Sequence, residues 1–146
     1  MEGILHKELS YALQGSFMEI RNILGPGHKE IVYQNALIEE FLSRKIVFEK
    51  EKSISILSPK SGKIIGHYRV DFLIDEKIIV EIKAVDMIPK NFIDQLYSYL
   101  RNSRYELGYF VNFKSPKLYI KRIIYTNDRK PFLNTNNANN LRIEQE

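Results

Sequence analysis

The stretch that decides the fold is YRVDFLIDEKIIVEIK, residues 68–83. Two largely apolar runs flank a polar tripeptide, Asp75-Glu76-Lys77, and this pattern predicts two strands joined by a tight antiparallel turn. The second run, residues 78–82, is nearly continuous, as in a central strand that is covered on both faces. Glu81 and Lys83 lie two residues apart at its end, so their side chains should share one face of the strand.

Three ionisable groups are expected to meet beside this strand. If the turn is a three-residue hairpin, Asp71 falls directly across from Glu81, which shares a face with Lys83. Two adjacent carboxylates repel each other and raise each other's pKa unless a cation lies between them. Mg²⁺ suits such a pair because it prefers oxygen ligands and keeps coordination positions for water and a substrate phosphate. Lys83 would orient the water or stabilise charge on the phosphorus.

Spacing alone leaves a second interpretation equally open. Glu81 and Lys83 can form a surface salt bridge on an edge strand, with Asp71 merely near the turn. Charged pairs on strands are common, and the pattern D-x₉-E-x-K is short enough to arise by chance. The rest of the chain has to decide between a site and a solvated strand face.

Periodicity predicts the elements around these two strands. Helical spacing of apolar residues is found over 5–24, 29–45 and 89–100, and strand-like runs are found over 47–56, 64–74, 78–82, 107–113 and 118–125. The order ααβββαββ predicts a single α/β (α+β) domain, residues 1–125, in which helices flank a mixed sheet. From Thr126 onward the Asn-rich sequence has few residues able to pack, so residues 126–146 are predicted to be a flexible polar tail.

Composition narrows the class of protein. The 146 residues fit one domain, and the count of 0 cysteines excludes disulfides and thiolate metal sites, so a reducing compartment is expected. The three histidines lack the spacing of a zinc site, and no stretch resembles a signal peptide or a membrane span. We therefore expect a cytoplasmic protein without membrane contact. The net charge of +4 is compatible with a polyanionic partner but does not establish one.

Several motifs along the chain occur together in one known family. They are Asp71 with Glu81-Ile82-Lys83, Gly27-His28-Lys29-Glu30-Ile31-Val32-Tyr33 preceded by Leu24-Gly25-Pro26, Gln95-Leu96-Tyr97-Ser98-Tyr99, and Asn112-Phe113. In this order they resemble the PD-(D/E)XK nuclease superfamily and, within it, the GxxExxY family, which is named for the pattern at residues 27–33. The resemblance covers residues 5–125. It departs at Val70, where the superfamily has a proline before the aspartate.

The resemblance implies a restriction-endonuclease-like core with a metal site. Asp71, Glu81 and the backbone carbonyl of Ile82 would ligate Mg²⁺ or Mn²⁺, and Lys83 would be the catalytic lysine. Glu30 would be an additional ligand, directly or through water. From the residues alone, Glu30 is also explained as an acid that the helix dipole favours in the first turn.

Further residues are expected around this centre. By resemblance, Gln95 would orient the lysine or a metal-bound water, and Tyr99 would contact a phosphate or brace Gln95; simple packing explains this i,i+4 pair equally well. Tyr33 is expected in the core, where it would support Glu30 from one turn away. By charge, Arg69 and Lys90 are candidates for phosphate contacts, which give affinity without sequence specificity.

Three functional classes follow, in order. The first is a metal-dependent phosphodiesterase that acts on nucleic acid, with DNA ahead of RNA. The second is a non-catalytic nucleic-acid-binding or protein-binding module that keeps the nuclease fold. The third is an oligomerisation or regulatory protein, ranked last because the uncharged Asn-rich run offers no recognition feature. Substrate strandedness, sequence preference, endo- versus exonuclease action and oligomeric state are left open by the sequence.

Overall fold

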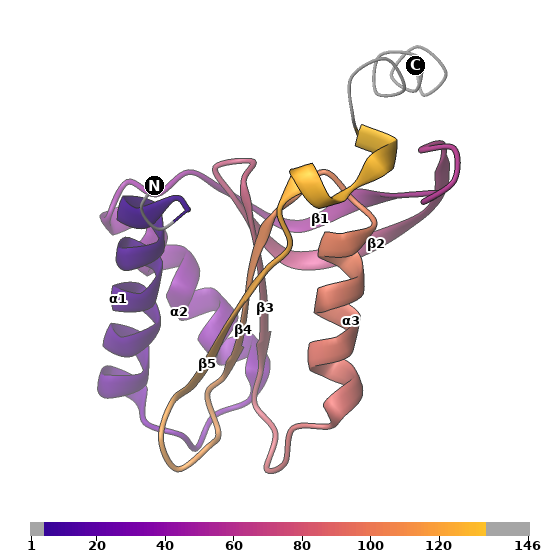
Figure 1. Ribbon diagram of the computed structural model, residues 1–146. Helices are drawn as coiled ribbons and strands as arrows, with labels where there is room; N and C mark the ends of the chain where they lie inside the picture. Colours follow the sequence, from indigo (N-terminus) through magenta and orange to yellow (C-terminus); the bar gives the residue numbers. More distant parts are fainter. Residues whose placement is uncertain (1–4, 134–146) are drawn as a thin grey trace.

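The computed structural model describes residues 5–133 and begins with two helices, α1 (Lys7–Leu24) and α2 (Glu30–Ser43). The remaining regular elements are β1 (Phe48–Leu57), β2 (Ile64–Ile74), β3 (Ile78–Lys83), α3 (Lys90–Arg101), β4 (Leu107–Asn112) and β5 (Tyr119–Ile124). The predicted order ααβββαββ is confirmed (Figure 1). The 11-residue strand β2 has the bounds that the sequence pattern predicted.

The five strands form one mixed sheet in the order β1-β2-β3-β4-β5. β3 and β4 run parallel, and the other neighbours are antiparallel. Two parallel neighbours need a long crossover connection, and α3 provides it. The fold class predicted from the sequence, a mixed sheet flanked by helices, is therefore confirmed.

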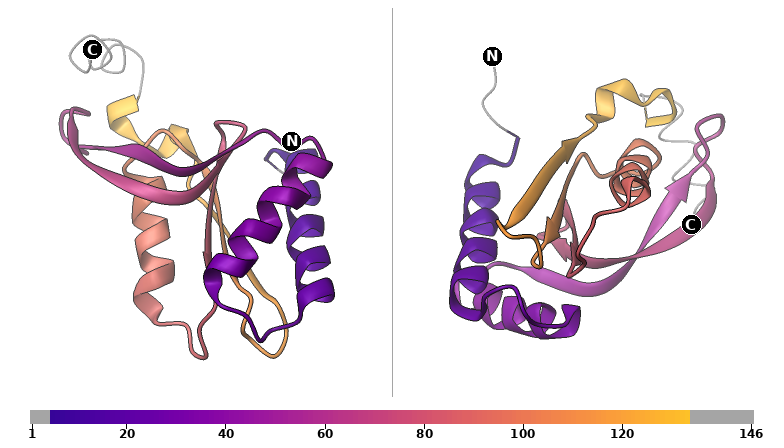
Figure 2. Two further views of the ribbon diagram at one scale, coloured as in Figure 1. Left: turned by 180° about the vertical axis from the view of Figure 1, so that it is seen from behind. Right: turned by 90° about the horizontal axis from the view of Figure 1, so that it is seen from below.

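Helices cover the sheet on both faces. α1 and α2 lie on one face and α3 on the other, as the view from below shows (Figure 2). Phe17, Phe41 and Tyr109 belong to the core under α1 and α2, whereas Leu96 and Phe110 belong to the core under α3. Since β4 is buried along its whole length, its neighbour β3 lies in the middle of the molecule. This burial explains the nearly continuous apolar runs of both strands.

Tyr33 fixes the connection between α1 and α2. Gly25 ends α1 with a φ of 74°, a conformation that favours glycine. The Tyr33 hydroxyl donates to the Gly25 carbonyl at 2.5 Å and accepts from the His28 N–H at 3.2 Å. Its ring is fully buried and stacks on Phe113, with the ring centroids 4.5 Å apart. The buried Tyr33 side chain therefore fixes the position of the start of α2, where Glu30 lies.

Tyr33→Phe is expected to lower the free energy of unfolding by about 1 kcal/mol, because the ring still stacks while two hydrogen bonds are lost. Urea denaturation followed by circular dichroism measures this change. Tyr11→Phe is the matched control, since Tyr11 is 82% exposed on α1 and should leave the midpoint unchanged. Equal midpoints for the two variants would contradict the role given to the Tyr33 hydroxyl.

The folded part of the chain extends beyond the predicted boundary at Tyr125. Two 3-10 turns cover residues 127–129 and 131–133, and between them Lys130 is 1% exposed. Its ammonium donates to the carbonyls of Ser103 and Tyr105 at 2.9 and 2.8 Å and to Asn127 Oδ1 at 2.7 Å. Phe132 packs with Leu57. The predicted flexible tail therefore begins too early, because single side chains that are buried by distant partners leave no periodic pattern. Residues 134–146 lie outside the described part.

Candidate active site

The site begins where β2 and β3 separate. The two strands pair as Phe72 with Val80, Leu73 with Ile79 and Ile74 with Ile78, which is the register of the predicted three-residue hairpin. Asp75 and Glu76 both have positive φ in the turn, and the Lys77 N–H closes it on the Ile74 carbonyl at 2.8 Å. Continued by one residue, this register would pair Asp71 with Glu81.

At Asp71 the side chain takes the place of a strand neighbour. Asp71 Oδ2 accepts a hydrogen bond from the Ile82 N–H at 2.8 Å. A strand residue directs its N–H and its C=O to the same neighbour, so the Ile82 carbonyl also faces this edge of β3. The carboxylate of Asp71 and the carbonyl of Ile82 thus lie at one edge of β3, which is called the opening because β2 and β3 no longer pair there.

A twist of β2 creates this opening. Val70 belongs to the core under α3, whereas Phe72, two residues on, belongs to the core under α1 and α2. Residues two apart on a regular strand share a face, so the strand turns about its axis at Asp71. On the neighbouring strand Glu51 has a φ of 50° and falls in the gap of the regular β1–β2 pairing. Beyond this point the β1–β2 ribbon leaves β3 and extends past α3 (Figures 1 and 2).

Glu81 is half-buried on the α3 face of β3, and its carboxylate interacts with that of Asp71. Its Oε2 atom is buried and has no hydrogen-bond partner among the described residues. Burial, and then the charge of Asp71, raises the pKa of Glu81 to about 9. Burial also raises the pKa of Asp71, although the Ile82 N–H acts in the opposite direction. The unpaired oxygen and the raised pKa values indicate that Asp71 and Glu81 need a shared proton or a cation between them.

Lys83 and Glu30 complete the charged cluster. The Lys83 ammonium lies 5.1 Å from the centre of the Phe92 ring, and its charge acts on Asp71, Glu81 and Glu30 alike. Glu30 is the first residue of α2 and accepts from Gln34 Nε2 at 3.2 Å. Burial raises the pKa of Glu30; Lys83 lowers it and Asp71 raises it. Glu30 of α2, on one face of the sheet, and Glu81 of β3, on the α3 face, therefore both interact with the charge of Lys83.

The donor set fits a divalent cation that prefers oxygen. Two carboxylates and one backbone carbonyl face the opening, and Glu81 has an oxygen without a donor. Within residues 5–133, no group of three or more acidic, histidine or cysteine side chains is arranged to hold a metal ion by itself. An ion here would thus depend on Asp71, Glu81, the Ile82 carbonyl and water, with Glu30 further away.

The residues predicted to surround the metal site differ in exposure: Tyr99 is buried, whereas Gln95, Arg69 and Lys90 are exposed. Tyr99 is 6% exposed, and burial together with the charge of Glu81 raises the pKa of its hydroxyl. Gln95 is exposed on α3, and its side chain makes no hydrogen bond to the described part of the chain. Arg69 Nη1 lies 3.6 Å from Glu51 Oε1 on the exposed ribbon. Lys90 is exposed at the first residue of α3.

Sequence reasoning gave no site role to two residues that the structure connects with this cluster. The buried Asn112 side chain accepts from the Val85 N–H at 3.0 Å and donates to the Val85 carbonyl at 2.9 Å. Together with a bond from the Phe113 N–H to the Lys83 carbonyl at 2.9 Å, it holds the chain just after Lys83. The ring of Tyr68 packs at a tilt on that of Tyr99, with the ring centroids 4.2 Å apart. The signal in the sequence for the contact between Asn112 and Val85 was a polar asparagine at the end of the otherwise apolar strand β4.

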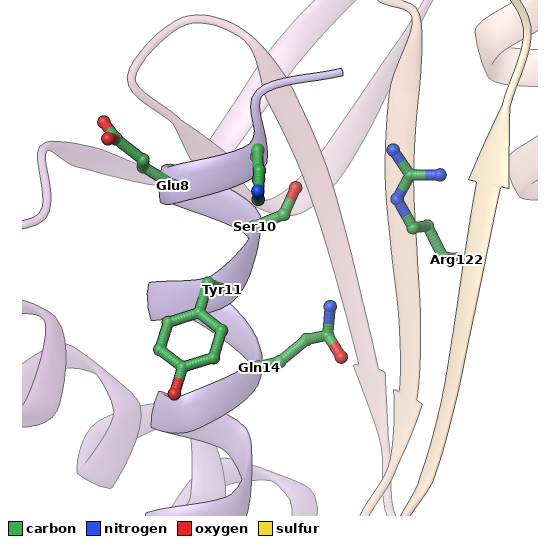
Figure 3. A pocket seen from close by; sticks show the side chains of 6 residues that line it. Glu8, Ser10, Tyr11, Gln14 and Arg122 are labelled. Atoms are coloured by element: carbon green, nitrogen blue, oxygen red, sulfur yellow. The ribbon is translucent and has the colours of Figure 1, made fainter. Parts of the chain in front are cut away.

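A hollow lies elsewhere, between α1 and β5. It has a volume of about 470 Å³ and is lined by Lys7, Glu8, Ser10, Tyr11, Gln14 and Arg122 (Figure 3). Arg122 Nη2 donates to the Leu5 carbonyl at 3.4 Å, and Gln14 Nε2 donates to the Tyr109 hydroxyl at 3.2 Å. None of the predicted site residues lines this hollow, and its side chains include no pair of carboxylates. The two carboxylates and the lysine beside β3, which this hollow lacks, therefore favour the edge of β3 as the candidate active site.

The fold and the charged cluster define a restriction-endonuclease-like domain. A family model described as the PD-(D/E)XK nuclease superfamily matches residues 7–123, so the chain belongs to this superfamily. None of the helices within residues 5–133 has the length and apolar character needed to cross a bilayer.

Solved structures with a similar arrangement include two proteins. An alkaline exonuclease from Laribacter hongkongensis has a TM-score of 0.48 and 14% identity, with 80% of this chain and 68% of that chain covered. The protein SSO0001 has a TM-score of 0.40 and 16% identity, with 98% of this chain and 87% of that chain covered. Neither likeness is close enough to transfer residues or activity. A comparison with curated protein sequences gave no match.

Proposed function

We propose that this protein is a divalent-metal-dependent nuclease that hydrolyses phosphodiester bonds of nucleic acid, with DNA ahead of RNA. The observation that carries the proposal is the meeting of Asp71, Glu81 and Lys83 at the opening between β2 and β3. Two half-buried carboxylates with raised pKa values beside a lysine are costly as a purely structural feature, and they suit a cation site.

Within the superfamily, we propose that the chain belongs to the GxxExxY family. The tyrosine of this pattern, Tyr33, holds the turn before α2 from the core. Its glutamate, Glu30, then starts α2 within the electrostatic reach of Lys83. The spacing of the pattern thus has a physical use, which is to present an acid from the α2 side to the opening beside β3.

Asp71, Glu81 and the Ile82 carbonyl would hold Mg²⁺ or Mn²⁺, with Glu30 as an additional ligand, directly or through water. When bound, such a cation polarises a phosphodiester and lowers the pKa of a bound water. Such a cation would allow both carboxylates to be ionised at the same time, because its charge would offset their mutual repulsion.

The chain's own residues have distinct tasks in this proposal. The Lys83 ammonium, which lies over the Phe92 ring, stabilises the negative charge that develops on the phosphate. Gln95, exposed on α3, orients the lysine or a metal-bound water once substrate is present, and Tyr99 contacts a phosphate from its place beside Glu81. Arg69 and Lys90 add phosphate contacts on the exposed surface.

Incubation of the purified protein with DNA and RNA, single- and double-stranded, is expected to give cleavage with Mg²⁺ or Mn²⁺ and none with EDTA. Calorimetry should detect metal binding by the wild type and at least a tenfold weaker binding by Asp71→Asn, which loses a charged ligand. If no substrate is cleaved and no heat of metal binding is found, the proposal is overturned.

The second candidate is a non-catalytic module that keeps the nuclease fold. It predicts binding of nucleic acid without cleavage under any metal condition. The presence of both carboxylates and the lysine at one opening favours the enzyme, since a binding module gains nothing from burying an unpaired carboxylate oxygen.

A further inference from the structure

Two tyrosines whose rings pack on each other at a tilt lie near the charged cluster. Tyr99, on α3, is 6% exposed, whereas Tyr68, on β2, is 43% exposed. Their ring centroids are 4.2 Å apart and their planes are inclined by 36°. One ring is thus anchored in the core under α3, and it supports a second ring that is open to solvent.

Both tyrosines lie near the proposed active site, Tyr99 through the charge of Glu81 and Tyr68 along β2. Burial, the charge of Glu81 and the hydroxyl of Tyr68 all raise the pKa of Tyr99, whose hydroxyl therefore lies within electrostatic reach of both side chains. Along β2, Tyr68 lies three residues before Asp71, about 10 Å along a strand. A molecule that places a phosphate at Asp71 and Glu81 therefore has Tyr68 within the span of its neighbouring nucleotide.

Two cations lie near Tyr68 on the exposed ribbon, and each is paired with a glutamate. Arg69 follows Tyr68 in sequence, and Lys52 pairs across from Val70 on β1. Their ion pairs, Arg69 with Glu51 at 3.6 Å and Lys52 with Glu49 at 3.1 Å, lie at the exposed surface. Exposed pairs of this kind contribute little stability, so an incoming phosphate can replace the carboxylate at small cost.

We propose that Tyr68 is a stacking platform for an unpaired nucleobase next to the scissile phosphate, and that the substrate is single-stranded at this position. The inference rests on the proposed nuclease function and names its substrate class. An aromatic ring that is supported from behind and open in front offers a face to any base, without sequence preference. In a duplex the faces of a base are covered by its neighbours, so only an unstacked base can use this ring.

The test measures binding without turnover. Fluorescence anisotropy in EDTA compares a labelled single-stranded DNA oligonucleotide with a duplex of the same sequence, for the wild type, Tyr68→Leu and Tyr68→Phe. Tyr68→Leu keeps apolar cover over Tyr99 but lacks an aromatic face, and it should weaken single-strand binding about tenfold, as loss of one base–aromatic stack does. Duplex binding should change less than twofold. Tyr68→Phe should bind like the wild type.

Tyr97→Leu is the matched control. Tyr97 lies on the same helix as Tyr99, is 37% exposed and packs on Tyr125, so its loss should leave both affinities unchanged. Equal weakening of single-strand and duplex binding by Tyr68→Leu, no weakening at all, or no measurable single-strand binding by the wild type would overturn the inference.

Failure of the inference is distinguishable from failure of the proposed function. Cleavage with Mg²⁺ by a protein whose strand preference does not depend on Tyr68 would leave the nuclease and remove the platform. A strand preference that depends on Tyr68 in a protein that never cleaves would leave the platform and remove the nuclease.

Discussion

Lys83→Ala is expected to reduce kcat for nucleic-acid cleavage by about 100-fold or more, while the protein stays folded and still binds metal. The expected size is that of removing one fixed group that stabilises charge in a transition state. Lys83 is suited to this task because it ends the central strand β3 and its ammonium lies 5.1 Å from the centre of the Phe92 ring. The chain just after Lys83 is held by hydrogen bonds between the Asn112 side chain and the backbone of Val85. Steady-state cleavage of a labelled substrate with Mg²⁺ measures the effect.

Lys77→Ala is the control for Lys83→Ala. It removes an exposed lysine of the same hairpin, whose ammonium pairs with Asp75 at 3.2 Å. Its kcat should stay within about twofold of the wild type, since exposed pairs contribute little. Activity that survives Lys83→Ala, with Lys77→Ala equally active, would place the catalysis at another site or in a contaminant.

Glu81→Gln is expected to stabilise the metal-free protein above neutral pH and to abolish cleavage. The pKa of Glu81 is about 9 in the folded state, against an ordinary value of 4.5. Between these values the folded state keeps a proton that the unfolded state releases, so the free energy of unfolding falls as pH rises. Each unit of such a shift corresponds to about 1.4 kcal/mol. The contribution of Glu81 to the free energy of unfolding is fully present below about pH 4.5 and is lost as the pH rises toward 9.

Urea denaturation in EDTA at several pH values from 5 to 9 tests this expectation. The wild-type midpoint should fall with pH relative to that of Glu81→Gln, which carries no ionisable group at this place. The difference between the two proteins isolates Glu81 from Lys130, whose pKa burial lowers to about 8 and whose contribution rises with pH. Glu76→Gln, an exposed change in the same hairpin, should follow the wild type. A constant difference across this range would refute the shared-proton description of the carboxylates.

Mg²⁺ should reverse the loss in the wild type, because a bound cation stabilises only the folded state. The gain at pH 8 should be smaller for Glu81→Gln, which lacks one charged ligand. Together these measurements separate a buried carboxylate that waits for a cation from one that is merely structural.

Much of the fold follows from local pattern. The hairpin register that brings Asp71 toward Glu81 depends on the tripeptide between two apolar runs, and the two strands do pair in that register. The lengths of the helices and strands follow from periodicity, because each element buries one face or both. Membership of the PD-(D/E)XK nuclease superfamily, which the motifs suggested, agrees with the family model that matches residues 7–123.

Other features could not be predicted from pattern. The tail after Tyr125 was expected to be unpacked, yet Lys130 and Phe132 are buried by residues far away in sequence. Gln95 and Tyr99 share one helical face by spacing, but Tyr99 lies beside Glu81 while Gln95 faces solvent. Spacing gives the relative direction of two side chains, whereas the direction of the whole helix depends on the sheet beneath it.

The sequence by itself determined that Asp71, Glu81 and Lys83 would come close, because a hairpin's register and a strand's two-residue period are local properties of the chain. The tertiary structure alone decided what lies around them. The twist at Asp71 that opens the edge of β3, the approach of Glu30 from α2, and the support of Tyr68 by Tyr99 all depend on contacts between distant segments. Such contacts form when two faces of one sheet are covered at once, and no single segment encodes that arrangement.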